Sequence, residues 1–245
     1  MLGKQTDYFR TVFWDSMNSR EKSGSKRGDV IDNLLEIKNE EQKSDFKFEG
    51  DALVSQSAMF SVAGLETSAT TTAFTLLELA RNIEIQERVR EEIKEKIKEN
   101  GLTYESVQEM KYLHQTIAET LRLVPPAPIL DRVALVDYKI PGTDIVIKKG
   151  TVIYTPLCGL HEDPKYFPNP QSYDPDRFSD ERKKDIVPCT YMPFGDGPRI
   201  CIGQRLALLQ VAVGLITILK DFEISLNPIY KNEVDPRAIF VNPRS

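Results

Sequence analysis

Hydrophobic residues recur at helical spacing along most of the chain, and breaks in that spacing mark the ends of the expected elements. The pattern predicts helices over residues 7–19, 29–38, 51–81, 84–99, 111–123 and 206–219. The segment 51–81 is long for a single helix and contains Gly64 and several threonines, which are weaker helix formers. The segment 84–99 carries opposite charges four residues apart, and Asn100-Gly101 ends it.

Between residues 137 and 155 the pattern changes to short extended runs. Three such runs lie at 138–140, 144–147 and 151–154, and Pro141-Gly142 and Lys149-Gly150 separate them. After His161 prolines become frequent, which predicts an ordered meander without long regular elements. Residues 20–28 and 39–47 are polar and are expected to be loops. We therefore expect a mainly α fold with small β sheets.

Composition narrows the classes of protein that fit. With 245 residues, 40% of them hydrophobic and 28% charged, the chain can bury a sizeable core in one or two domains. A net charge of −5 argues against a nucleic-acid-binding protein. Three widely spaced cysteines suit a reducing compartment better than a disulfide framework. The chain shows no signal segment, and its longest apolar run, 206–219, falls short of the ~20 residues of a membrane span.

One glycine-rich segment carries the most specific chemistry of the sequence. Residues 194–203 read Phe-Gly-Asp-Gly-Pro-Arg-Ile-Cys-Ile-Gly, which places Cys201 in a loop just before an apolar helix. Backbone N–H groups near Gly197 and Gly203 and the positive helix end would favour the thiolate, the form that binds metals. Arg199 adds positive charge and can bind a carboxylate, while Phe194 can shield the sulfur. The loop is therefore a candidate metal-thiolate site.

A second candidate is a charged pair within the helix predicted over 111–123. Glu119 and Arg122 lie three residues apart, so they share one face of the helix and can pair. Such pairs are usually exposed and contribute little to stability. Here the apolar neighbours Leu121 and Leu123 predict a partly buried site. A third cation would help to satisfy a carboxylate in that setting.

Four motifs in this order resemble those of the cytochrome P-450 family. They are Ala63-Gly64-Leu65-Glu66-Thr67 in a long helix, Glu119 with Arg122, Pro175-Asp176-Arg177-Phe178 in the meander, and the cysteine loop. The loop is most similar to that of insect microsomal enzymes that act on xenobiotics. The resemblance implies that residues 1–245 are the C-terminal portion of a cytochrome P-450 domain, without the N-terminal half and its membrane anchor.

The resemblance also implies roles on the cysteine side. Cys201 would be the proximal ligand of a haem iron, with Phe194 and Gly203 beside it. Arg132 and Arg199 match positions that bind the haem propionates. A structural triad would link the meander to the core and consists of Glu119, Arg122 and Arg177.

On the oxygen side, the resemblance implies a site in the long helix. Gly64, beside Ala63, would leave room for dioxygen. Thr67 would hydrogen-bond a carbonyl or the bound oxygen and, with Glu66, relay protons. The apolar segment 124–130 resembles a substrate-lining segment and predicts a lipophilic substrate.

For the whole enzyme, the resemblance implies a monooxygenase that inserts one atom of O2 into a lipophilic substrate. Electrons would come from an NADPH-dependent flavoprotein reductase. The full-length enzyme would lie on the cytoplasmic face of the endoplasmic reticulum membrane. Family members are about twice as long, and Trp14 is followed by Asn18 where their propionate-binding helix has arginine. We therefore expect a fragment that, in isolation, folds poorly and binds haem weakly or not at all.

Two other chemistries stay open from the residues alone. A structural zinc module could use Cys158, His161, Cys189 and Cys201, because Cys-x-x-His is a usable ligand spacing. It lacks the second close pair of ligands that most structural zinc sites have. A cysteine hydrolase could pair Cys201 with His114 or His161, but the sequence offers no group to orient the base.

Overall fold

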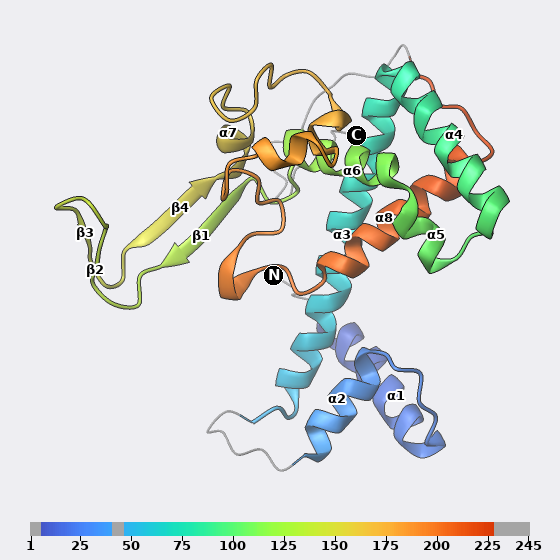
Figure 1. Ribbon diagram of the computed structural model, residues 1–245. Helices are drawn as coiled ribbons and strands as arrows, with labels where there is room; N and C mark the ends of the chain where they lie inside the picture. Colours follow the sequence, from blue (N-terminus) through green and yellow to red (C-terminus); the bar gives the residue numbers. More distant parts are fainter. Residues whose placement is uncertain (1–5, 41–46, 228–245) are drawn as a thin grey trace. The chain divides into compact units, whose positions relative to one another are not determined.

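The described chain is mostly helical, as the hydrophobic pattern predicts. The computed structural model describes residues 6–40 and 47–227, so part of the predicted loop 39–47 and the first residues of the chain lie outside it. The long helices, shown in Figure 1, are α1 (Thr6–Ser23), α2 (Val30–Asn39), α3 (Asp51–Arg81), α4 (Ile83–Asn100), α6 (Lys111–Leu123) and α8 (Gln204–Leu219). A mainly α fold with small sheets is confirmed. The predicted loop 20–28 is partly wrong, because α1 continues to Ser23.

The chain divides into two compact units, residues 1–65 and 66–245, and α3 passes from one to the other. In the first unit, α1, α2 and the start of α3 share a small apolar core formed by Phe13, Met17, Leu34, Leu53 and Val54. The side chain of Asp29 caps α2 by accepting the N–H groups of Ile31 and Asp32. Asp29 also accepts Arg20 of α1 at 2.8 Å, which ties the first two helices together.

The second unit is built around α6, which is buried on most of its surface. Leu113, Ile117 and Leu121 recur every four residues and pack in one apolar core with residues of α4 and α8. The opposite side of α6 meets the meander, where the hydroxyl of buried Tyr173 donates to the Thr116 carbonyl at 2.9 Å. A helix enclosed on both sides has a fixed position, so its polar residues are held in place.

Threonines of α3 satisfy their hydroxyl groups within the helix itself. Three of them return their hydroxyls to carbonyl groups four residues earlier: Thr71 to Thr67, Thr72 to Ser68 and Thr75 to Thr71. These bonds satisfy hydroxyl groups that would otherwise be buried without a partner. The predicted single helix over 51–81 is thereby confirmed.

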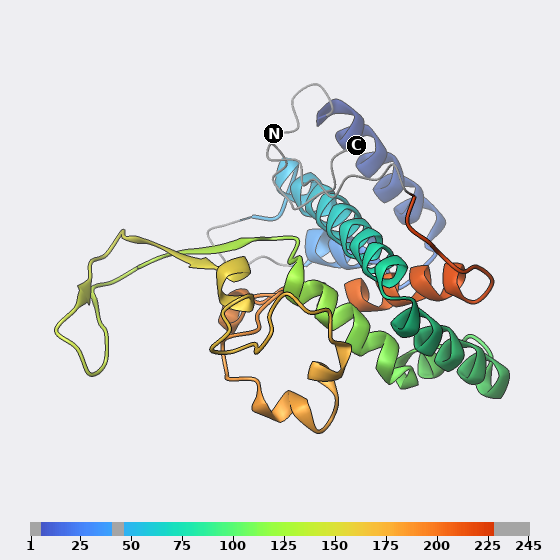
Figure 2. The same cartoon turned by 90° about the horizontal axis from the view of Figure 1, so that it is seen from above.

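Two small antiparallel pairs make up the sheet structure. β1 (Ile129–Val133) pairs with β4 (Val152–Pro156), and β2 (Tyr138–Lys139) pairs with β3 (Val146–Ile147). Figure 2 shows these strands extending away from the helices of their unit. The three predicted strands are present, but β1 was not expected. Its sequence, Ile-Leu-Asp-Arg-Val, follows prolines and does not alternate cleanly.

Short elements fill the remaining chain. Helices α5 (Tyr104–Glu109) and α7 (Leu157–His161) were not predicted because each is about one turn long. The meander contains only the short 3-10 helices η2 (Pro175–Phe178) and η3 (Arg182–Asp185), as its prolines suggest. A third 3-10 turn, η4 (Gly197–Arg199), lies in the cysteine loop.

Gln86 anchors the segment that follows α8. Its side chain is fully buried, donates to the Leu79 and Ile224 carbonyls, and accepts the Ile224 N–H at 2.8 Å. We expect Gln86→Leu to lower the free energy of unfolding by about 2 kcal/mol, because buried backbone groups lose their partners. Urea denaturation measures this change. The exposed Gln108→Leu is the matched control, and an equal effect of both changes would contradict the anchoring role.

Candidate functional site

The cysteine loop owes its shape to two glycines with left-handed backbone. Gly195 and Gly197 both have φ of 74°, a conformation that residues with a side chain rarely adopt. The carboxylate of Asp196 accepts the Gly197 N–H at 2.7 Å and so caps the turn η4. The Cys201 N–H donates to the Phe194 carbonyl at 2.9 Å, which closes the loop. Cys201 is thus presented at the exposed end of a fixed turn.

The loop borders a cavity of about 260 Å³. α3 contributes Thr67, Ser68 and Thr71 to its wall, and the loop contributes Phe194 and Cys201. The remaining lining is mostly apolar and comes from α6, the segment before β1, β1 itself and α8: Ile117, Leu121, Pro126, Ala127, Leu130, Ala207, Leu208 and Val211. A sulfur donor therefore lies at the edge of an apolar space.

Two arginines reach the same cavity from different segments. Arg199 lies in η4, and Arg132 lies in β1, the strand that the pattern did not predict. A methyl group built on Gly195 would lie 3.8 Å from Nη2 of Arg132, so the guanidinium rests against the loop. The cavity thus combines one thiol, two positively charged side chains and apolar walls.

Ser68 adds an unsatisfied polar group to the wall. Its Oγ is buried and has no hydrogen-bond partner in the described structure. The neighbouring Thr71 and Thr72 both bond back to α3 carbonyls, so Ser68 departs from their behaviour. An orphaned buried hydroxyl beside the cavity fits a space that a polar or water-bearing ligand occupies.

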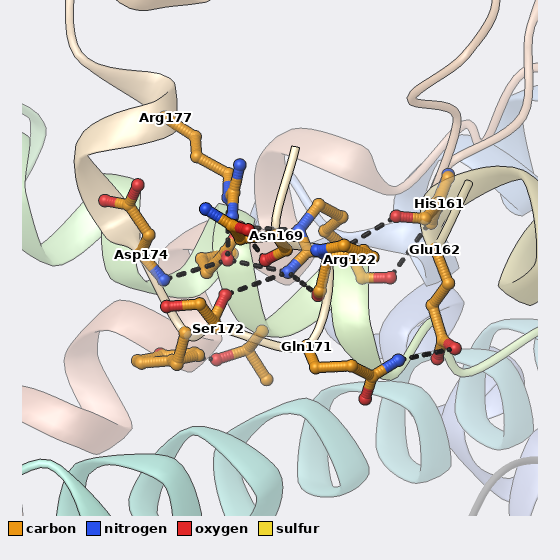
Figure 3. A network of polar contacts seen from close by, with 12 residues as sticks. Arg122, His161, Glu162, Asn169, Gln171, Ser172, Asp174 and Arg177 are labelled. Carbon is orange, nitrogen blue, oxygen red and sulfur yellow. Dashed lines mark hydrogen bonds and ion pairs between the residues drawn. The ribbon is translucent and has the colours of Figure 1, made fainter. Parts of the chain in front are cut away.

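Beneath the loop, α6 and the meander share a buried ionic network (Figure 3). Glu119 and Arg122 are fully buried, and Arg177 is 6% exposed. Arg122 donates to both carboxylate oxygens of Glu119 at 2.8 Å, and Arg177 Nε lies 3.4 Å from Glu119 Oε1. The Asp174 N–H donates to the same carboxylate at 2.9 Å. The structure therefore brings together the three residues that the sequence grouped.

The two arginines also bind backbone carbonyl groups of the meander. Arg122 donates to the carbonyls of His161, Pro170 and Ser172, and Arg177 donates to that of Asn169 at 2.9 Å. Burial raises the pKa of the Glu119 carboxyl, while Arg122 and the Asp174 N–H oppose that rise. Two guanidinium groups contact this carboxyl, which therefore has charged partners on both sides.

The zinc hypothesis is wrong for this structure. Among residues 6–40 and 47–227, no three His, Cys, Asp or Glu side chains form a group that could hold a metal. His161 is buried, and both ring nitrogens already bond to the backbone: Nδ1 with the Arg122 carbonyl and Nε2 with the Met192 N–H, each at 3.1 Å. Cys158, Cys189 and Cys201 therefore gain no shared histidine ligand.

The same contacts argue against a cysteine hydrolase. The ring of His161 has no free nitrogen, and Nε2 of His114 contacts the Val107 carbonyl at 3.0 Å. Neither histidine lines the cavity that holds Cys201. Neither histidine is therefore placed to act as a general base for this thiol.

Not every predicted site residue reaches the cavity. Thr67 lines it, but Ala63, Gly64 and Glu66 are not among the lining residues, and Glu66 is exposed. Ala63 and Gly64 belong to the first unit. Gly203 caps α8 with φ of −92°, and nothing in the described structure explains why this position is glycine.

Sequence reasoning missed Ser68 and misassigned His161. No local pattern distinguishes Ser68 from the neighbouring threonines, because Ser68 differs from them only in that its hydroxyl lacks a hydrogen-bond partner. His161 precedes the meander and could have been recognised as a polar residue beside an apolar turn, Leu157 to Leu160. Its partners lie 39 and 31 residues away, beyond the reach of any spacing rule.

Comparison with known proteins identifies the family. The family model described as Cytochrome P-450 matches residues 1–244. Cytochrome P-450 6k1 of Blattella germanica is 46% identical over 239 residues, covering 89% of this chain and 46% of the relative. Probable cytochrome P-450 6g2 of Drosophila melanogaster is 39% identical, covering 98% of this chain and 49% of the relative. The chain therefore spans about half the length of the curated relatives it matches.

A solved structure has the same fold. The crystal structure of a cytochrome P-450, CYP102L1, superposes with a TM-score of 0.86 at 27% identity. The match covers 97% of this chain and 54% of that one. Within the part of the chain that the structure describes, no helix combines the length and apolarity needed to cross a bilayer.

The buried network predicts a large effect of removing its single negative charge. Glu119→Gln leaves two buried guanidinium groups without their carboxylate, so we expect the free energy of unfolding to fall by about 3–5 kcal/mol. Chemical denaturation measures it. The control is Asp176→Asn, which removes an exposed ion pair with Arg88 and should cost less than about 1 kcal/mol. Equal losses of unfolding free energy in the two variants would show that burial of the network adds nothing to stability.

Stability should also depend on His161 in mild acid. Burial of the imidazole lowers the pKa of His161 to about 4, from an ordinary value of 6.5. As pH falls, His161 therefore binds a proton in the unfolded chain before it does so in the folded chain. The contribution of the neutral ring to stability is full above pH 6.5 and is lost as pH falls toward 4. We expect wild type to lose about 3 kcal/mol more than His161→Gln over this range. Parallel pH profiles of the two proteins in denaturant titrations would contradict this.

Proposed function

Because this chain belongs to the cytochrome P-450 family, we propose that it forms the haem-binding portion of a haem-thiolate monooxygenase. The enzyme would insert one atom of O2 into an organic substrate and reduce the other to water. The observation that carries the proposal is the cavity that combines Cys201, Arg132 and Arg199 with apolar walls. We propose that residues 1–245 are the C-terminal portion of one such domain.

The donor set fits haem. Cys201 offers a thiolate for iron, the two arginines offer partners for two carboxylates, and the apolar lining suits the faces of a porphyrin. Haem, when bound, supplies the iron that activates dioxygen, and a thiolate ligand favours O–O cleavage. Phe194 lines the cavity with Cys201 and would shield the sulfur on that side. Gly203 leaves the start of α8 without a side chain near the loop.

On α3, we assign proton handling to Thr67 and Glu66. Thr67 lines the cavity, where its hydroxyl can hold a water molecule or donate to bound oxygen. Glu66 is exposed and can exchange protons with solvent, so the adjacent pair connects the cavity to bulk water. By resemblance to the family, Gly64 and Ala63, one turn earlier, would give oxygen room, and neither lines the described cavity. Ser68 provides a further polar group on the same helix.

The Glu119–Arg122–Arg177 triad would hold the meander in place beneath the haem. The support is its burial and its bonds to four carbonyl groups and one N–H group from residues 161 to 174. The triad takes no part in chemistry in this proposal. It fixes the chain that leads into the cysteine loop.

The substrate would be lipophilic. Pro126, Ala127 and Leu130 line the cavity, and they belong to the apolar segment predicted to contact substrate. As the resemblance of the cysteine loop to insect microsomal enzymes implies, we further propose a role in xenobiotic metabolism, with electrons from an NADPH-dependent flavoprotein reductase. By the same similarity, the full-length enzyme would be microsomal, on the cytoplasmic face of the endoplasmic reticulum membrane.

A second candidate concerns the chain by itself. Some large hydrophobic side chains are highly exposed: Ile202, next to Cys201, at 91%, and Leu135 at 79%. Apolar surface of this kind favours association or poor folding when it has no cover. In this candidate the isolated chain binds haem weakly or not at all and is not catalytic.

The test is the optical spectrum of the reduced protein with carbon monoxide. We expect a red-shifted Soret band, typical of a thiolate ligand, in wild type and its complete loss in Cys201→Ala. Cys158→Ser and Cys189→Ser are matched controls that should keep the band, because neither residue lines the cavity. Haem bound without the band in wild type would refute the thiolate assignment. Absence of haem would favour the non-catalytic candidate for the isolated chain.

A further inference from the structure

His161 lies at the junction between the buried ionic network and the cysteine loop. Its side chain is fully buried between the rings of Phe167 and Tyr191, with centroids 6.3 and 5.5 Å away. Its own carbonyl accepts Arg122 Nη1 at 3.0 Å. The residue is therefore fixed both by its backbone and by its ring.

The partners of the ring determine where its proton lies. The Arg122 carbonyl can only accept, so Nδ1 of His161 must carry hydrogen to bond with it at 3.1 Å. The Met192 N–H can only donate, so Nε2 must be bare to accept it at 3.1 Å. Only the neutral Nδ1–H tautomer satisfies both groups.

Met192 begins the turn that leads to the cysteine. Its carbonyl accepts the Gly195 N–H at 2.9 Å, and the Phe194 carbonyl accepts the Cys201 N–H at 2.9 Å. The hydroxyl of the preceding Tyr191 donates to the Ala118 carbonyl of α6 at 2.9 Å. A continuous series of hydrogen bonds thus runs from the end of α6 through His161 to the loop.

We propose that His161 is a positioning residue for Cys201, acting through the Met192 N–H to hold the cysteine loop against α6. The inference deepens the proposed function and rests on it for the role of the thiol. The imidazole has two tasks: Nδ1 ties it to α6, and Nε2 holds the loop. Only the second task positions the cysteine. Substitutions that keep one of the two contacts and remove the other should therefore separate the two roles.

Asparagine and glutamine separate the two nitrogens. The amide of asparagine occupies the place of Nδ1, and that of glutamine occupies the place of Nε2. His161→Asn therefore keeps a donor for the Arg122 carbonyl but offers no acceptor to Met192. His161→Gln keeps an acceptor for Met192 and loses the donor. Both variants lose the aromatic ring, so they are matched for its packing.

The first measurement is amide hydrogen exchange in the 245-residue chain at neutral pH. We expect segment 192–201 to exchange roughly tenfold faster in His161→Asn than in His161→Gln, as loss of one hydrogen bond implies. Helix α4 is the internal reference and should exchange equally in both. Equal exchange of segment 192–201 in the two variants would overturn the proposal, as would an unprotected Met192 amide in wild type.

The second measurement uses protein loaded with haem. The thiolate-type band of the reduced carbon monoxide complex should persist in His161→Gln and disappear in His161→Asn. The reverse pattern, or the same spectrum in both, would count against positioning through Met192. If wild type itself lacks the band, the proposed function fails, while the exchange experiment still decides the role of His161.

A third measurement needs no variant and covers the case in which both fail to fold. Nitrogen-15 chemical shifts of the His161 ring in wild type report which nitrogen carries hydrogen. We expect a protonated Nδ1 and a bare Nε2. A ring with hydrogen on Nε2 could not accept the Met192 N–H, and that result would refute the proposal.

Discussion

A charged carboxylate without solvent contact persists only if charged and polar groups replace the water it has lost. Glu119 meets this requirement with bonds from Arg122, Arg177 and the Asp174 N–H. The buried guanidinium groups of Arg122 and Arg177 need further hydrogen-bond acceptors, and carbonyl groups of the meander provide them. An irregular segment of about twenty residues is thereby ordered without a sheet or a long helix, because its backbone is the partner of buried guanidinium groups.

The helical part of this fold follows from the sequence because helix formation is local. The limits predicted for α6, 111–123, agree with the structure since Pro125-Pro126 excludes helix beyond them. β1 could not be found in the same way. Its strand character depends on pairing with β4 some twenty residues later, and its own side chains are largely exposed.

The residues of the candidate site also divide into those that local sequence predicts and those that depend on distant partners. Motif residues such as Cys201 and Glu119 could be selected from spacing, because their neighbours in sequence are also their neighbours in space. Arg132 could be placed by resemblance alone, since an unpredicted strand carries it to the loop. His161 was grouped with cysteines by a ligand spacing, yet its ring nitrogens bond to backbone groups far along the chain. Spacing identifies chemical type, but it does not reveal which partners a buried ring has.

Besides the Tyr191–Ala118 bond, these observations give α6 two connections to the cysteine segment that meet at Arg122. One passes through charge, from Glu119 and Arg122 to the carbonyl groups of the meander. The other passes through neutral groups, from the Arg122 carbonyl through the His161 ring to Met192. Arg122 takes part in both, with its guanidinium in the first and its carbonyl in the second. A loop that must hold a sulfur at a fixed point needs constraint in more than one direction, and two connections from one rigid helix provide it.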